Sequence, residues 1–142
     1  MSMIKLLGKM KKYFIISSII AITLFLLSGC NKSQDNKKCI SYSTAQVIKV
    51  SGPNTALVYQ EINLTINFYL VNGCGHFEGL EANSLNNSTS ISIKAKYEGC
   101  ICTDNLIGGE TNYKFKTEKA GVYYLKFLQP DKTYLIDTIT VN

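Results

Sequence analysis

Five cysteines and a single histidine are the residues of this chain best suited to chemistry. Two short segments, Cys74-Gly75-His76 and Cys100-Ile101-Cys102, could converge as three thiolates and one imidazole, a ligand set that suits zinc or copper(I). One residue separates the ligands in each segment, whereas paired zinc ligands are usually separated by about two to four residues. We therefore expect no metal and no cofactor. A metal-binding or redox protein that uses Cys74, His76, Cys100 and Cys102 is a function that ranks third, behind the two non-catalytic roles given at the end of this section.

Catalytic patterns are missing from the sequence. His76 is the only histidine, so a Ser-His-Asp or Cys-His arrangement would have to be built around it. The sequence has no Gly-x-Ser-x-Gly elbow, no phosphate-cradling loop and no His-Glu-x-x-His segment. Glu78 and Glu81 could form a carboxylate pair, but such a pair is more typical of a solvated edge. We expect no catalytic residues and a protein that is not an enzyme.

The first 30 residues have the order of a secretory signal. Four lysines come before an apolar stretch, Tyr13 to Leu27, and small residues and Cys30 follow it. The apolar stretch is 15 residues long, which is shorter than the roughly 20 residues of a membrane-spanning helix. A signal sequence is therefore favoured over a retained transmembrane helix.

The segment Leu27-Ser28-Gly29-Cys30 resembles the lipobox of bacterial lipoproteins. That resemblance implies that residues 1–29 are removed and that Cys30 carries acyl chains, such as palmitate, which anchor the protein to a membrane. Residues 30–38 are then a lipidated polar tether, and residues 39–142 form one domain. The expected location is the bacterial cell envelope, more often the outer membrane, with the domain in the periplasm or on the cell surface.

Removal of the signal changes the charge of the protein. The full chain has 15 lysines and 10 acidic residues, a net charge of +5. Four of those lysines lie in the signal, so the chain from Cys30 onward has 11 lysines, 10 acidic residues and a net charge of +1. The sequence has no arginine, the usual bidentate reader of phosphate. We expect no nucleic-acid partner.

Four cysteines remain after Cys30, and an even number in a small exported domain predicts disulfides. Cys100 and Cys102 are two residues apart on a predicted strand, so their Cβ atoms would lie roughly 6.5 Å apart, too far for a bond between them. We expect Cys39 and Cys74 each to bond to one member of this pair. Both pairings stay open, with a slight preference for Cys74 to Cys100.

Alternating apolar residues predict strands throughout the domain. In Glu61 to Val71 every second residue is apolar, and Ser90 to Cys102 repeats the pattern, with Ile91, Ile93 and Ile101 expected on one face. Turn-prone groups such as Ser51-Gly52-Pro53-Asn54, Asn86-Asn87-Ser88 and Gly108-Gly109 separate the segments. The other predicted strands are Ala45 to Val50, His76 to Ala82, Asn112 to Thr117, Gly121 to Gln129 and Thr133 to Val141. About seven strands without helices predict an all-β fold, an antiparallel β-sandwich.

Gly121-Val122-Tyr123-Tyr124-Leu125 resembles the penultimate strand of immunoglobulin-like domains, where Gly-x-Tyr-x-Cys is typical. The resemblance implies an immunoglobulin-like sandwich in which Tyr123 is the structural tyrosine corner. Leu125 stands where that family has its inter-sheet cysteine, Lys119 stands where an aspartate is common, and the chain has no tryptophan. The domain is therefore not of the antibody type.

Nine tyrosines suggest a recognition surface, because tyrosine supplies a large amphipathic contact area at low entropic cost. Tyr59, Tyr69, Tyr113 and Tyr124 are candidates, and alternation places Tyr69 and Tyr124 opposite their core-facing neighbours. The expected function is a non-catalytic binding or adhesion module for an unknown envelope protein or glycan. The alternative is a structural or accessory subunit of an envelope complex.

Overall fold

The domain consists of β-strands. The structure is a computed structural model, and it describes residues 38–142. No helix long and apolar enough to cross a membrane occurs among these residues. The strands are β1 (Ile40–Thr44), β2 (Gln46–Ser51), β3 (Thr55–Ala56), β4 (Ile62–Leu70), β5 (Gly75–Leu85), β6 (Ser88–Glu98), β7 (Ile107–Phe115), β8 (Gly121–Leu128) and β9 (Tyr134–Val141).

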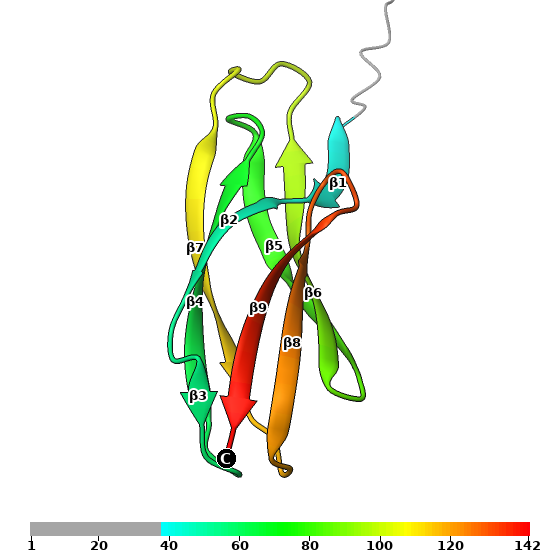
Figure 1. Ribbon diagram of the computed structural model, residues 1–142. Helices are drawn as coiled ribbons and strands as arrows, with labels where there is room; N and C mark the ends of the chain where they lie inside the picture. The colour runs from blue at the N-terminus through cyan, green and yellow to red at the C-terminus, as the bar shows by residue number, and fades with distance from the viewer. Residues whose placement is uncertain (1–37) are drawn as a thin grey trace, which may run out of the picture. The chain divides into compact units, whose positions relative to one another are not determined.

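The strands form two sheets packed face to face (Figure 1). In the larger sheet the order is β1-β6-β8-β9-β3, and β5 pairs with the other edge of β6. The smaller sheet has the order β2-β4-β7. The prediction of an all-β sandwich is confirmed.

Alternation along the central strands builds the core between the sheets. In β4 the side chains of Leu64, Ile66 and Phe68 are buried, and in β6 those of Ile91 and Ile93 are buried. Their neighbours along each strand point outward, as the period of two requires. Burial of large aliphatic and aromatic side chains at about 1.5–3 kcal/mol each is the main stabilising contribution.

Residues 38–142 form nine strands, where roughly seven were expected. The additional ones are β1 and the two-residue β3, which are too short or too exposed to give a clear apolar alternation. Two pairings, β6 with β8 and β3 with β9, are parallel, whereas an antiparallel sandwich was expected. The first of these arises because β7, between β6 and β8 in sequence, belongs to the other sheet, so the chain returns in the same direction.

The strand expected from Ser90 to Cys102 ends earlier, at Glu98. Gly99 has φ +146°, in the region that favours glycine, and a Cβ at this position would lie 2.7 Å from Cys74 Sγ. The chain leaves the sheet at Gly99, so the expectation that Ile101 shares the core face of Ile91 is wrong. Ile101 is 96% exposed.

The pair Gly108-Gly109, expected as a turn, lies inside β7. Gly109 pairs with Phe68 of β4, and a Cβ at Gly109 would overlap the Phe68 ring. The glycine thus leaves space for a large core side chain of the neighbouring strand. At Gly108 a Cβ would meet only Tyr69 at an ordinary contact distance of 3.7 Å.

We expect Gly109→Ala to destabilise the domain by about 1–3 kcal/mol, because the added methyl overpacks the core against Phe68. Urea unfolding of the variant measures this loss. Gly108→Ala is the matched control and is expected to be neutral or slightly stabilising. Phe68→Leu should recover part of the loss when combined with Gly109→Ala. Equal stability of the two alanine variants would contradict this packing.

Tyr113, one of the tyrosines considered for an outward face, points inward from β7. Its ring packs against the core, and its hydroxyl hydrogen-bonds with Thr89 of the other sheet. Burial raises the pKa of Tyr113 above its ordinary value, and the Thr89 hydrogen bond partly opposes the rise. The Thr89 hydroxyl also lies 2.9 Å from that of Ser84. This short polar chain satisfies the buried hydroxyl of Thr89 and links the two sheets.

Candidate functional site

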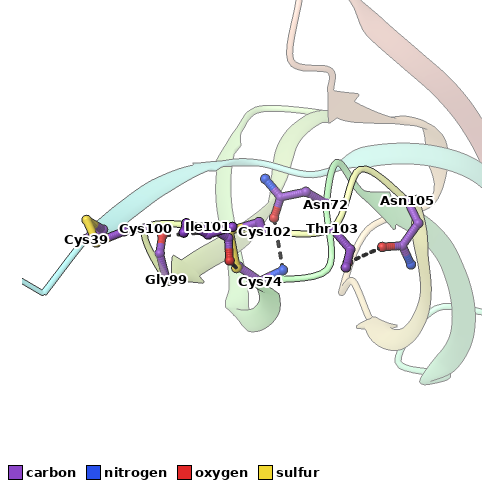
Figure 2. Close-up of a disulfide and its surroundings, with 9 residues drawn as sticks. All are labelled: Cys39, Asn72, Cys74, Gly99, Cys100, Ile101, Cys102, Thr103 and Asn105. Carbon is purple, nitrogen blue, oxygen red and sulfur yellow. Dashed lines mark hydrogen bonds between the residues drawn. A yellow bond between two sulfur atoms is a disulfide. The ribbon is translucent and has the colours of Figure 1, made fainter.

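Two disulfides fasten one end of the sandwich, where the loops 71–74 and 99–106 meet Cys39 (Figure 2). Cys39 bonds to Cys100 across a Cα distance of 5.0 Å, and Cys74 bonds to Cys102 across 5.4 Å. We call the residues of these two loops together with Cys39 the disulfide end. Backbone hydrogen bonds support it: the Gly73 amide donates to the Thr103 carbonyl at 3.0 Å, and the Gly99 amide donates to the Cys39 carbonyl at 2.9 Å.

Each of Cys39 and Cys74 bonds to one member of the Cys100/Cys102 pair, as expected, but the preferred pairing of Cys74 with Cys100 is wrong. Cys39 precedes β1, and β1 pairs with the last residues of β6, so Cys39 lies beside the first residue after that strand end. Cys39 therefore forms its disulfide with Cys100. Cys74 precedes β5 on the opposite edge of β6 and bonds to Cys102, further along the loop.

The ligand set considered for a metal is occupied by sulfur–sulfur bonds. Cys74, Cys100 and Cys102 are all half-cystines, so no free thiolate stands beside His76. Across residues 38–142, no cluster of three or more His, Cys, Asp and Glu side chains has metal-binding geometry. His76 lies on β5 opposite Lys96, whose ammonium is 2.6 Å from Glu98. The hydrogen bond between these two side chains lowers the pKa of Glu98 and raises the pKa of Lys96.

Tyr123 makes a local hydrogen bond of the kind its position predicts. The side chain is 9% exposed, and its hydroxyl donates to the carbonyl oxygen of Lys119 at 2.8 Å, four residues upstream. The hydroxyl of Thr117 donates to the Tyr123 oxygen at 2.9 Å. The Tyr123 ring also meets Phe115 edge to face, with 5.4 Å between ring centroids. The residue fixes the turn between β7 and β8 and is a structural element.

Tyr69 and Tyr124 are both exposed, at 38% and 46%, but they do not form one surface. Tyr69 stands on β4 of the smaller sheet and Tyr124 on β8 of the larger sheet. The outer faces of two packed sheets point in opposite directions. The expectation that Tyr69 and Tyr124 belong to one recognition surface is therefore wrong. Tyr69 lies near the exposed Ile48 of the adjacent β2, and Tyr124 lies near exposed apolar residues of β8 and β9.

The outer face of the larger sheet carries a groove of about 630 Å³ across β5, β6, β8 and β9. Small residues of β6, Ser88 and Ser90, pair with the larger Tyr124 and Lys126 of β8, which leaves the groove beside β8. It is lined by Asn83, Ser84, Leu85, Ser88, Ser90, Lys126, Tyr134 and Ile136. We call these residues the outer groove.

Exposed apolar side chains surround the outer groove. Leu85 is 75% exposed, Ile136 56% and Tyr134 48%, and Val122 and Tyr124 stand on the same face of β8. Lys126 supplies a positive charge, and it is absent from the three ion pairs formed among residues 38–142. The groove therefore offers hydroxyls, an amide, a cation and the aromatic ring of Tyr134 together. Sequence reasoning identified Tyr124, which pairs with Ser88 at the side of the groove, but none of the eight residues that line it, because only strand pairing brings these together.

Cys30 and the lipobox-like segment lie outside the described residues. The described part is a small, doubly disulfide-bonded β-sandwich domain with an open groove on one sheet. Residues 64–141 match the family model of the ORF11 beta-sandwich domain, and this match covers more than half of the chain. The chain therefore belongs to the ORF11 beta-sandwich domain family. No curated protein and no solved structure matches the chain significantly.

Proposed function

We propose that this protein is a lipoprotein of the bacterial cell envelope, held to a membrane at Cys30, and that its β-sandwich is a non-catalytic binding module. The lipobox-like segment Leu27-Ser28-Gly29-Cys30 supports the anchor. The observation that carries the binding role is the outer groove, because exposed aromatic and apolar residues gathered around a concave surface are typical of recognition sites.

The chemistry of the outer groove favours an extended glycan of the envelope as its ligand. Ser88, Ser90 and Asn83 can exchange hydrogen bonds with sugar hydroxyls. Tyr134 offers a ring face to the apolar side of a sugar, and Lys126 can pair with an acidic substituent. Because the groove lies open on the outer face of the larger sheet, a polymer can bind across it without passing one of its ends through a closed channel.

The alternative is an accessory subunit that binds another envelope protein, and β5 provides the observation in its favour. This strand pairs with β6 on one edge, and its other edge has no strand beside it within residues 38–142. A free edge can accept a strand from a partner through main-chain hydrogen bonds. The exposed Leu85 and Phe77 on β5 would then provide side-chain contacts.

Tyr134→Ala in the full-length protein tests the groove. We expect at least a tenfold loss of affinity for the glycan selected from an envelope glycan panel, about 1.4 kcal/mol, because tyrosines are frequent hot spots. Titration calorimetry measures the affinity. Tyr69→Ala is the matched control, since Tyr69 is similarly exposed on the other sheet, and its affinity should stay unchanged.

Three results decide between the two classes of ligand. Loss with Tyr134→Ala alone supports glycan binding in the outer groove. An equal loss with both variants overturns the groove as the site. If no glycan saturates and a protein from envelope extract binds stoichiometrically, with β5 protected from hydrogen exchange, the accessory-subunit alternative replaces the glycan proposal.

A further inference from the structure

We propose that the disulfide end of the domain contacts the lipid surface and that Ile101 enters the membrane interface. This inference rests on the proposed lipid anchor at Cys30. Ile101 is 96% exposed, the largest exposed fraction among the exposed large apolar residues of the described chain. Two further exposed apolar residues belong to the same end. Leu106 is 61% exposed and directly precedes β7, and Val71 is 50% exposed and directly follows β4. Their neighbours Leu70 and Ile107 are register partners, so Val71 and Leu106 continue the two paired strands side by side.

The loop holds Ile101 in its exposed position. Its neighbours Cys100 and Cys102 are bonded to different segments, Cys39 and Cys74 (Figure 2). The carbonyl oxygen of Ile101 lies 3.7 Å from Cys74 Sγ. With both flanking residues fixed by covalent bonds, the loop cannot turn the side chain into the core, so Ile101 stays exposed unless another surface covers it.

The disulfide end has few charges to oppose contact with lipid. The loops 71–74 and 99–106 contain one charged side chain, that of Asp104. The last residues before the domain include Lys37 and Lys38, which can interact with anionic head groups. A nearly uncharged surface with protruding aliphatic residues fits the interfacial region of a membrane better than open water.

The tether keeps this end within reach of the membrane. Eight residues lie between Cys30 and Cys39, so the nine residue steps from one to the other span at most about 31 Å. Cys39 is bonded to Cys100, the direct neighbour of Ile101. The C-terminus lies at the opposite end of the sandwich (Figure 1). Leu57 belongs to that end, because the amide of the next residue, Val58, donates to the carbonyl of the C-terminal Asn142. The nine residues of β4 run between the two ends, a length of about 30 Å. The short tether, which enters the domain at Cys39, therefore favours the lipid surface as the partner of this end.

A single tryptophan tests the contact, because the natural chain contains none. Ile101→Trp in the full-length lipidated protein is reconstituted into phosphatidylcholine vesicles with brominated acyl chains. We expect blue-shifted emission and quenching at least about twofold stronger than for Leu57→Trp, given an insertion depth of about 5–10 Å. Leu57 is the matched control, since it is 63% exposed at the opposite end. Loss of four hydrogens relative to the reduced chain, measured by mass, verifies both disulfides in each variant.

Flotation with the vesicles separates the two proposals. If both variants float and the tryptophan of Ile101→Trp is quenched more than that of Leu57→Trp, the membrane contact is supported. If both float and are quenched equally, the contact is overturned while the anchor stands. If neither floats, the anchor fails, and the membrane contact that depends on it is overturned as well.

Discussion

Replacement of Cys30 by serine is expected to release the protein from the membrane. In a bacterial host the wild-type protein should stay in the membrane fraction after a carbonate wash, and Cys30→Ser should appear in the soluble fraction. The reason is that a serine has no thiol for lipid attachment, and stable anchoring needs more than one acyl chain at roughly 0.8 kcal/mol per buried methylene. Intact mass of the wild-type protein should show loss of residues 1–29 and addition of lipid.

Ser33→Ala in the tether is the control, and its membrane fraction should equal that of the wild type. The opposite outcome has a definite meaning: if Cys30→Ser resists the carbonate wash, the apolar stretch Tyr13 to Leu27 remains attached and anchors the protein as a transmembrane segment. That result would remove the lipoprotein proposal. It would leave the fold and the outer groove untouched, because both lie in residues 38–142.

Local alternation predicted the centre of the fold well. The segment Glu61 to Val71 was expected as a strand, and β4 covers Ile62–Leu70 with every second side chain buried. The pattern is reliable here because side chains of a strand point alternately to its two faces, and one face of this strand packs against the other sheet.

The same pattern was misleading where tertiary contacts decide the backbone. In the sequence, the apolar alternation of β6 extends to Ile101, but Gly99 and the two disulfides turn the chain out of the sheet. The pair Gly108-Gly109 is typical of a turn, yet it lies in β7, and the absence of a side chain at Gly109 leaves space for the Phe68 ring of β4. Neither contact could be predicted without the register of the neighbouring strand.

The outer groove could not be predicted for a related reason. Ser90, Lys126 and Ile136 lie in one row across β6, β8 and β9, although they are far apart in the sequence. The row depends on the parallel pairing of β6 with β8, and that pairing exists because β7 crosses to the other sheet. A single sequence has no local signal for such a crossing, so the sequence identified only Tyr124, which stands beside the groove on an evident strand, and none of the lining residues.

Removal of the two disulfides should have the largest effect on the stability of the domain. The Cys39–Cys100 bond spans 61 residues and the Cys74–Cys102 bond 28 residues. Chain entropy then predicts losses of about 4 kcal/mol for Cys39→Ser/Cys100→Ser and about 3.5 kcal/mol for Cys74→Ser/Cys102→Ser, because the longer loop restricts the unfolded chain more. Urea unfolding of each double variant measures the loss. Hydrogen exchange of the first should also show β1 opening, since this exposed strand is held at its start by Cys39.

The crossed variant Cys39→Ser/Cys102→Ser tests the pairing itself, because it retains Cys74 and Cys100. With the bonds of the structure, both disulfides are broken, so this variant should be the least stable of the three and should expose two free thiols to iodoacetamide. With the alternative pairing of Cys74 to Cys100, it would keep one disulfide and expose none. Its stability would then exceed that of the other two variants, which would each have lost both bonds, and this reversed order would contradict the geometry of the disulfide end.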